Sequence, residues 1–290
     1  MKFNGMKNKI ILSILLCGLN LPVCAFDFGN LGDIQNALKS AQHVNEEVKK
    51  ATEDVPEPKE IEMGGGIASN LLGAAPLLQN RAVQKYVNDV GRWLALQTER
   101  PDLPWQFGVL DDNDVNAFAS PGGYVFITKG LLSHMKSEAE LAGVLAHEIS
   151  HVLRKHHLNA IKKGARTGLM AEFAGQALKE KGVNPELTKL VNAGTELYAR
   201  GLDKEDEFEA DRMGVVIAAR GGYDPYGLPA VLQTLQSLNA QDTKLALMFK
   251  THPALADRLS LLDKLMSGRF DGFEGQPDLS ARFMAVMNGK

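Results

Sequence analysis

The sequence is poor in cysteine and has no excess of basic charge. Its only two cysteines, Cys17 and Cys24, both lie within the first 25 residues. A mature chain without that segment therefore has neither disulfides nor a cysteine nucleophile. The formal net charge is −3, whereas nucleic-acid-binding proteins normally carry a basic excess, so we expect no nucleic-acid partner.

The sequence also lacks an N-terminal hydrophobic run long enough to span a bilayer comfortably. The apolar run Ile10–Leu19 follows three lysines and precedes Val23-Cys24-Ala25, a pattern typical of a secretory signal cleaved after Ala25. Acylation of Cys24 in a lipoprotein is the alternative, although Pro22 and Val23 fit that signal poorly. Either way, we predict an exported protein and favour the bacterial periplasm.

Composition divides the chain into four segments. After the predicted signal peptide at residues 1–25, residues 26–60 are expected to hold a short helical segment (26–52) and a charged linker with prolines (53–60). Residues 61–268 are expected to form one compact domain, and residues 269–290 a tail without a clear pattern. Gly64-Gly65-Gly66 is expected to interrupt any helix at the start of the domain.

Within the domain, helical periodicity predominates over strand alternation. Helices are expected at 81–96, 138–157, 162–181, 184–200, 205–220, 228–238, 244–250 and 254–266. Strands are expected at 105–110 and 117–128, the second broken at Pro121-Gly122-Gly123. The patterns predict an α+β fold that is mainly helical, with a small sheet beside the helix at 138–157.

That helix carries the strongest functional pattern, His147-Glu148-Ile-Ser-His151. Ser137 followed by Glu140 is a capping box that predicts where the helix begins. His147 and His151 are four residues apart, so both imidazoles leave the same side of the helix and can bind one zinc ion. Glu148 between them can act on a metal-bound water. Chance would place this pattern in roughly one of a hundred such chains, which favours a metal site over an ordinary core helix.

His157 is the nearest candidate for the third protein ligand that a catalytic zinc ion usually has. Its spacing from His151 occurs in proteases with a glycine where the helix breaks, whereas this chain has Arg154 there. On a continued helix His157 lies roughly 15 Å along the axis from His147, so it cannot bind the same ion. We expect His156 and His157 to form a solvated helix end.

A carboxylate further along the chain is the better candidate. Glu207 and Asp211 are four residues apart, which suits one carboxylate that binds the metal and another that hydrogen-bonds a ligand imidazole. Spacing alone leaves Glu205 and Glu209 as alternatives to Glu207. Gly214, one turn from Ala210, would let this helix approach the metal helix closely.

Four motifs together resemble those of the zinc metalloprotease family that includes HtpX, BepA, LoiP and the type I CAAX prenyl proteases. They are Asn116–Phe126, His147-Glu148-xx-His151, Glu207-xxx-Asp211, and Thr251-His252-Pro253 with Arg258. They occur in the family's order, and the resemblance extends over residues 61–268. It is greatest for soluble exported bacterial members, because we find neither the membrane-spanning helices of HtpX nor a helical-repeat domain of the BepA kind.

The resemblance implies a gluzincin-type fold with one zinc ion bound by His147, His151 and Glu207. Asp211 would then hydrogen-bond a ligand imidazole. Glu148 would take a proton from the attacking water and pass it to the leaving nitrogen. His252 would either stabilise the developing oxyanion or occupy the open zinc position as a brake.

The Asn116–Phe126 stretch is expected to offer a strand edge to which an extended substrate adds. The predicted substrate contacts are Asn116, Ala117, Phe118, Gly122 and Gly123. Backbone recognition of this kind favours unfolded or misassembled polypeptides over a defined sequence.

The sequence thus predicts a zinc-dependent endopeptidase that acts on unfolded or misassembled exported proteins in periplasmic quality control. Peripheral association with a membrane or with outer-membrane assembly machinery is consistent with that compartment. One alternative is a non-catalytic zinc-containing chaperone or adaptor whose site is permanently closed by His252. Another is a zinc hydrolase that acts on something other than peptides.

Overall fold

A computed structural model describes residues 55–163, 201–238, 242–273 and 276–289. The chain divides into two compact units, residues 1–47 and 48–290, and every described residue belongs to the second. The predicted signal peptide, the helical segment at 26–52, the helix at 184–200 and most of the helix at 162–181 lie outside the described residues.

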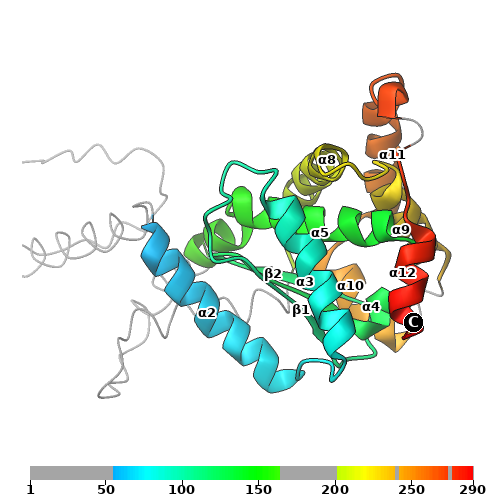
Figure 1. Cartoon of the computed structure of the whole chain (residues 1–290). Helices are drawn as coiled ribbons and strands as arrows, with labels where there is room; N and C mark the ends of the chain where they lie inside the picture. Colours follow the sequence, from blue (N-terminus) through cyan, green and yellow to red (C-terminus); the bar gives the residue numbers. More distant parts are fainter. Residues whose placement is uncertain (1–54, 164–200, 239–241, 274–275, 290) are drawn as a thin grey trace, which may run out of the picture. The chain divides into compact units, whose positions relative to one another are not determined.

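Two helices precede three short strands, and the elements after the strands are helical (Figure 1). The described elements are α2 Glu57–Ala74, α3 Arg81–Ala95, β1 Gln106–Leu110, β2 Ala117–Ser120, β3 Tyr124–Thr128, α4 Lys129–Ser133, α5 Glu138–Leu153, α8 Lys204–Arg220, α9 Gly227–Ser237, η1 Thr243–Leu245, α10 Ala246–Thr251, α11 Leu255–Met266, η2 Asp271–Phe273 and α12 Ser280–Met287. Residues 156–163 are helical as well. The fold is α+β and mainly helical, as predicted. No described helix is both long and apolar enough to cross a bilayer.

The sheet has three strands in the order β1-β3-β2, with β1 parallel and β2 antiparallel to β3. β2 and β3 form a hairpin around Pro121-Gly122-Gly123, where the two glycines have φ values of +77° and +100° that only glycine adopts readily. The predicted break at this tripeptide is therefore a hairpin turn.

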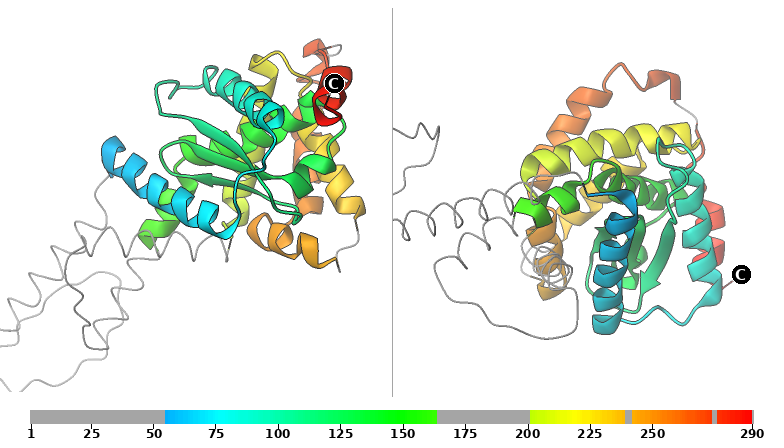
Figure 2. Two further views of the ribbon diagram at one scale, coloured as in Figure 1. Left: turned by 60° about the horizontal axis from the view of Figure 1, so that its bottom comes forward. Right: turned by 90° about the vertical axis from the view of Figure 1, so that its left-hand side faces the viewer.

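Alternation along the strands sends side chains to two separate cores. Val125 and Ile127 pack in the core that contains α3 and α5, whereas Phe126 packs with Met63 and Ile67 of α2. Two views of the fold show α2 on the opposite side of the sheet from α5 (Figures 1 and 2).

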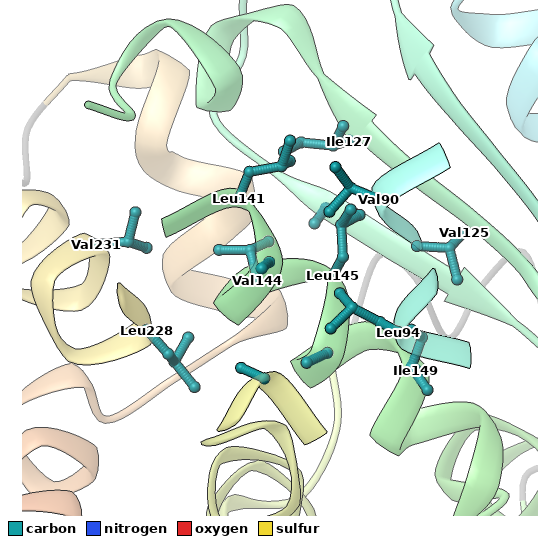
Figure 3. Packing of buried hydrophobic residues seen from close by; sticks show 14 of the residues in the cluster. Val90, Leu94, Val125, Ile127, Leu141, Val144, Leu145, Ile149, Leu228 and Val231 are labelled. Atoms are coloured by element: carbon teal, nitrogen blue, oxygen red, sulfur yellow. The ribbon is translucent and has the colours of Figure 1, made fainter. Parts of the chain in front are cut away.

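α5 is the central element, because all of its residues are buried. Ser137 is its N-cap, and the Ser137 side chain accepts a hydrogen bond from the backbone N–H of Glu140. Figure 3 shows the apolar side chains of α5 (Leu141, Val144, Leu145, Ile149) among those of α3 (Val90, Leu94), the sheet (Val125, Ile127) and α9 (Leu228, Val231). This packing fixes the rotation of α5 about its axis, and with it the direction in which its histidines point.

α8 lies directly against α5 because its contact face is built from small residues. A Cβ atom added to Gly214 would lie 3.0 Å from the backbone nitrogen of His147, closer than side chains normally pack. Ala210, one turn earlier, is fully buried. The close approach that the sequence predicted for this helix therefore exists, and it brings the acidic residues of α8 beside the histidines of α5.

The prediction that Gly64-Gly65-Gly66 interrupts a helix is wrong, because α2 runs through all three. A Cβ atom on Gly64 would lie only 1.7 Å from the carbonyl oxygen of Pro121, so the glycine lets the helix press against the hairpin turn. The linker predicted at 53–60 is likewise wrong from Glu57 onward, where α2 begins. Tertiary packing outweighs the low helix propensity of glycine here.

Two further predictions are wrong, one about where the metal helix ends and one about the C-terminal residues 269–290. The metal helix ends at Leu153 and not at 157, because Lys155 adopts a left-handed conformation with φ +56°. Residues 269–290 are not patternless, since α12 forms there and buries Phe283 in the main core.

Candidate metal centre

Four side chains from α5, α8 and the residue after α10 meet at one point. They are His147, His151, Glu207 and His252, and one potential ligand atom from each lies within 4.8 Å of all the others. All except His252 are almost completely inaccessible to solvent. Among the described residues these are the histidines and acids that converge as a metal-ligand group.

The separations between three of these groups fit a single tetrahedral ion. The Nε2 atoms of His147 and His151 are 3.0 Å apart, and the carboxylate of Glu207 lies 3.5 Å from the first and 3.4 Å from the second. Ligand atoms at about 2.0–2.2 Å from zinc in a tetrahedral arrangement are separated by about 3.3–3.5 Å. The His–His–Glu set is thus already spaced for an ion of this size.

The carboxylates at the cluster outnumber the guanidinium groups, which favours binding of a cation. Glu148, Glu207 and Asp211 are all buried, and Arg258 is the guanidinium buried among them. Three carboxylates beside one guanidinium leave two negative charges that either a metal ion or protons on the neighbouring histidines must balance, because buried charges are stable only when paired or bound to metal. A divalent ion would neutralise that excess, so the donor set fits the metal on charge as well as spacing.

The carboxylates also shift the pKa of the histidines they surround. Burial lowers the pKa of His147, but hydrogen bonding to Asp211 and Glu207 outweighs burial and raises it to about 9. Burial raises the pKa of Glu207, yet His252 and Arg258 outweigh burial and hold that pKa well below its ordinary value. A metal ion must displace the His147 proton, so metal binding releases a proton.

Asp211 positions His147 from behind. One of its carboxylate oxygens lies 2.9 Å from His147 Nδ1, the ring nitrogen that faces away from Glu207. Arg258 in turn donates two hydrogen bonds to Asp211, at 2.7 and 2.6 Å, and its third nitrogen lies 3.0 Å from Glu207. This chain of contacts holds the His147 ring with Nε2 directed at the cluster.

His151 is held by a different partner. Its Nδ1 atom lies 2.9 Å from Nδ1 of His156, and Nε2 of His156 lies 3.3 Å from Glu209. With His151 binding through Nε2, its Nδ1–H donates to His156, whose own Nε2–H then points at Glu209. One histidine ligand is therefore supported by a carboxylate and the other by a second imidazole.

The prediction of a solvated His156-His157 pair is wrong, since both side chains are buried. His157 lies beside His151, with ring centroids 5.3 Å apart, because the chain turns at Lys155 and a new helical segment in another direction begins at residue 156. The exclusion of His157 as a ligand assumed a helix continuous to residue 157, whereas α5 ends at Leu153. His157 is nevertheless absent from the four-residue cluster found in the described part of the chain.

Glu148 and His252 face each other beside this cluster. Nε2 of His252 lies 3.9 Å from Glu148 Oε1, and Nδ1 of His252 lies 3.0 Å from Glu207. Burial raises the pKa of Glu148, which makes its carboxylate a stronger proton acceptor. Glu148 Oε2 is buried and has no hydrogen-bond partner among the described residues.

The space around His252 is small. Two cavities adjoin it, of about 40 and about 10 Å³, and both are lined by Ala117, Glu148 and His252. The larger one is otherwise mostly apolar, with Val144, Leu228 and other side chains from α5 and α9. Cavities of this size hold water but not a peptide.

The structure separates the predicted substrate contacts into two groups. Ala117 lies at the cluster, with its carbonyl oxygen 3.5 Å from His252 Nε2, and Phe118 lines the smaller cavity. Gly122 and Gly123 lie at the far end of β2, in the hairpin turn against Ile61 and Trp105. Turn geometry accounts for both glycines, and their roles as substrate contacts stay predictions.

In this structure the Asn116 side chain contacts other residues of the chain. Its side chain is fully buried, and its amide oxygen accepts hydrogen bonds from the Ala117 N–H and the Thr251 hydroxyl. Ala117–Ser120 and Glu148 are buried in the same way, so a substrate contact by Asn116 stays a prediction. Asn116 ties the start of β2 to the residue before His252.

The roles of three residues at the site were not predicted from the sequence. Arg258 pairs with Asp211 and Glu207, and His156 with Glu209 supports His151. Arg258 had a usable signal, because it occupies the buried stripe of α11 with Leu255, Leu262 and Met266. A charged residue in an apolar stripe is rarely buried unless paired. His156 had no comparable signal, since its burial depends on the turn at Lys155.

Comparison with known proteins agrees with this geometry. The model of Peptidase family M48 matches residues 81–266, from the start of α3 to the end of α11. The beta-barrel assembly-enhancing protease of Escherichia coli (strain K12) is 30% identical over 209 residues, which cover 70% of this chain and 42% of that protein. The chain therefore matches about two fifths of the length of this relative.

Mitochondrial relatives match over a similar stretch. The mitochondrial metalloendopeptidase OMA1 of Arabidopsis thaliana is 30% identical over 187 residues, covering 64% of this chain and 36% of that protein. The same-named protein of Schizosaccharomyces pombe is 28% identical over 179 residues, covering 62% and 52%. Because the family model spans more than half of the sequence and includes the whole His–His–Glu–His cluster, this chain belongs to peptidase family M48.

Proposed function

We propose that the chain is a zinc-dependent endopeptidase in which Glu148 is the general base. The observation that carries the proposal is the position of Glu148, buried beside three converging ligands with one oxygen free of any hydrogen-bond partner in the described residues. A purely structural zinc site needs no such proton acceptor. Membership of peptidase family M48 supports the same reaction class.

In this mechanism His147, His151 and Glu207 hold the metal. A zinc ion bound there supplies Lewis-acid chemistry, which lowers the pKa of water and polarises a peptide carbonyl. Glu148 accepts the proton of the attacking water and delivers it to the leaving amide nitrogen. Asp211 and His156 keep the two imidazoles in the tautomer that leaves Nε2 free for the metal.

His252 acts as a brake in this proposal. One of its ring nitrogens lies within 4.8 Å of a ligand atom of each of the other three residues, and the cavities around it are too small for a peptide. A fourth protein ligand would close the position that a catalytic zinc ion needs open. Substrate access therefore requires His252 to move away from Glu207.

The proposed substrate is an extended, unfolded polypeptide that lies along β2, one of the two edge strands of the sheet. The Ala117 carbonyl, next to His252 and Glu148, marks the end of that strand at the cluster. Residues Ala117–Ser120 are buried, so the surrounding chain must open for substrate to bind.

The proposed setting is quality control of misassembled exported proteins in the bacterial periplasm. The predicted signal peptide at residues 1–25 supports export, and the name of the E. coli relative connects that protein with β-barrel assembly. On this proposal, peripheral contact with a membrane or with outer-membrane assembly machinery brings the enzyme to its substrates.

The test compares full-length protein with Glu148→Gln in cleavage of unfolded casein, with metal content measured on the same samples. We expect Glu148→Gln to abolish cleavage while about one zinc ion per chain is retained. Glu99→Gln is the control: Glu99 is an exposed carboxylate that precedes the proposed catalytic residues in sequence, and its variant should cleave casein normally. Cleavage that survives in Glu148→Gln would refute the mechanism.

His252→Ala decides between a brake and an assistant. If His252 blocks the metal, the variant cleaves casein faster than the unmodified chain, whereas a slower variant means that His252 stabilises the oxyanion.

The four-residue ligand set also favours a second candidate, a non-catalytic zinc-containing adaptor with a closed site. Bound zinc with no cleavage by either the unmodified chain or His252→Ala would favour the adaptor.

A further inference from the structure

A groove runs along the side of α8 that does not face α5. Two adjoining cavities, of about 470 and about 400 Å³, lie between α8 and the segment from α11 to η2. They share Arg212, Leu265 and Arg269, so they form one continuous groove. α8 and α11 lie side by side in the views of the fold (Figures 1 and 2).

The α8 wall of this groove is a single helical face. Its residues Phe208, Arg212, Val216 and Ala219 recur at intervals of three or four. The residues that serve the metal cluster, Glu207 and Asp211, occupy the neighbouring face. Asp211 and Arg258 also line one wall of the groove, so the groove lies behind the metal cluster, and Glu148 is not among its lining residues.

The floor of the groove is apolar and unusually exposed. Val216, Leu261 and Phe273 are 37%, 43% and 38% exposed, and they are three of the eight large hydrophobic side chains that are exposed among the described residues. Scattered exposed apolar residues need no explanation, but several gathered in one groove mark an interaction surface.

The rim of the groove is basic. Arg212, Arg220, Lys264 and Arg269 line it and are all exposed. Within the described residues, no carboxylate forms an ion pair with any of the four. The acids that line the groove are Glu205 at one end and Asp211, which is already paired with Arg258. In a chain of net charge −3 this is a local concentration of unpaired positive charge.

The apolar floor and the basic rim together indicate the chemistry of a binding partner. Four cations around an apolar floor attract a ligand that is both acidic and amphipathic. From Glu205 to Arg220 the groove follows α8 for roughly 22 Å, the length of a helix of about 15 residues. A concave surface between two helices fits a helix laid in a groove better than it fits a flat lipid surface.

We propose that this groove binds an acidic, amphipathic helical segment of another polypeptide. Its apolar side chains cover Val216, Leu261 and Phe273, and its carboxylates pair with the basic rim. The proposal is independent of peptidase activity, because binding in the groove requires neither a metal ion nor Glu148.

The test measures binding of a fluorescent 15-residue peptide to the full chain by anisotropy, at low and at high salt. The peptide carries leucine at helical three- and four-residue spacing and glutamate elsewhere, and a matched peptide carries glutamine in place of glutamate. We expect the acidic peptide to bind, the glutamine peptide to bind much more weakly, and salt to reduce the difference.

Two sets of variants locate the binding site. Arg212→Glu with Arg269→Glu should weaken binding of the acidic peptide about tenfold or more, because two attractive contacts become repulsive. Arg81→Glu with Lys244→Glu makes the same change in net charge at exposed positions outside the groove and should leave binding unchanged. Leu261→Ala with Phe273→Ala should weaken binding of both peptides, since it removes apolar contact area.

Several results would overturn the proposal. Failure of the acidic peptide to bind would do so, as would binding that is equal in the groove variants and the control. Phosphatidylglycerol vesicles that bind through the same arginines in place of the peptide would identify a membrane surface instead. Self-association that is lost in the groove variants, without peptide binding, would assign the groove to contacts between copies of this chain.

Discussion

Arg258 and Asp211 form a buried, two-pronged ion pair directly behind the metal cluster. Nε and Nη2 of Arg258 donate to the two carboxylate oxygens of Asp211 at 2.7 and 2.6 Å, and both side chains are 2% exposed. The pair joins α11 to α8, and Asp211 continues the connection to His147 on α5. Three helices distant in sequence are thus fixed to one another at the metal site.

Removing one member of this pair should destabilise the fold. In Arg258→Met the carboxylates of Asp211 and Glu207 lose their guanidinium, and breaking a buried ion pair in this way costs about 3–5 kcal/mol. Urea unfolding in the presence of a chelator measures the loss without a contribution from bound metal. Arg220→Met removes an exposed arginine from α8 and is the control, expected to change stability by less than about 0.5 kcal/mol. Equal stability of the two variants would contradict the assignment.

The imidazole of His156 should matter for metal affinity. Replacing His156 by phenylalanine removes the acceptor for His151 Nδ1–H, and loss of such a partner typically weakens metal binding about 10- to 100-fold. His156→Gln keeps an acceptor oxygen and should recover much of the affinity. Competition with a chromogenic zinc chelator measures both variants, and His134→Phe, outside the cluster, is the control. Unchanged affinity in His156→Phe would mean that His151 needs no partner on that side.

Local patterns predicted the parts of the site that one helix can hold. The two histidines and Glu148 follow from spacing within α5, and its N-cap at Ser137 follows from local chemistry. Spacing did not distinguish Glu207 from Glu205 and Glu209, because the choice depends on how α8 is rotated against α5. The resemblance to known proteases favoured Glu207, and the structure brings that residue to the histidines.

The failures have a common cause in tertiary contacts. Glycine in α2 is unfavourable for an isolated helix, but Gly64 is the residue that lets α2 meet the hairpin turn. Lys155 gives no local sign of its left-handed backbone, yet that turn buries His156 and His157 beside the metal helix. Neither contact can be inferred from residues that are neighbours in sequence.

Close approach of α8 to α5 should be required for the metal site. In Gly214→Ala the added Cβ atom would lie 3.0 and 3.1 Å from backbone atoms of His147, so α5 and α8 would have to separate by a few tenths of an ångström. Overpacking of this kind costs about 1–3 kcal/mol, and the shift also moves Glu207 away from its partners. We expect weaker zinc binding together with lower stability, measured by chelator competition and urea unfolding.

Gly73→Ala provides the matched control for that substitution. A Cβ atom at Gly73, in α2, meets nothing within 4 Å. Alanine is favoured over glycine inside a helix by about 0.5–1 kcal/mol, so this variant should be as stable as the unmodified chain or more so. If Gly214→Ala behaved like Gly73→Ala, the helices would not be held at the distance that the structure shows.

Stability should fall at alkaline pH because of a cluster around Glu138, the first residue of α5. The hydroxyl groups of Tyr86 and Tyr223 donate to the Glu138 carboxylate at 2.5 and 2.9 Å, and Arg282 of α12 pairs with the same carboxylate. Burial, together with the neighbouring negative charge, raises the pKa of both tyrosines above the ordinary value of 10.0. Above pH 10 the folded chain therefore keeps two tyrosine protons that the unfolded chain releases.

The sign of the effect follows from those raised values. Below pH 10 both states hold the tyrosine protons, and the full stability is present. Above pH 10 only the unfolded state releases them, so each tyrosine lowers the free energy of unfolding by up to about 1.4 kcal/mol per pH unit. Tyr86 is half-buried and solvent screens it, so it should contribute less than this limit.

Urea unfolding between pH 8 and 11 tests this. The free energy of unfolding should fall less with rising pH in the double variant Tyr86→Phe with Tyr223→Phe than in the control Tyr226→Phe, which changes an exposed tyrosine outside the cluster. Parallel curves for the two variants would mean that the Glu138 cluster does not hold these protons in the folded state.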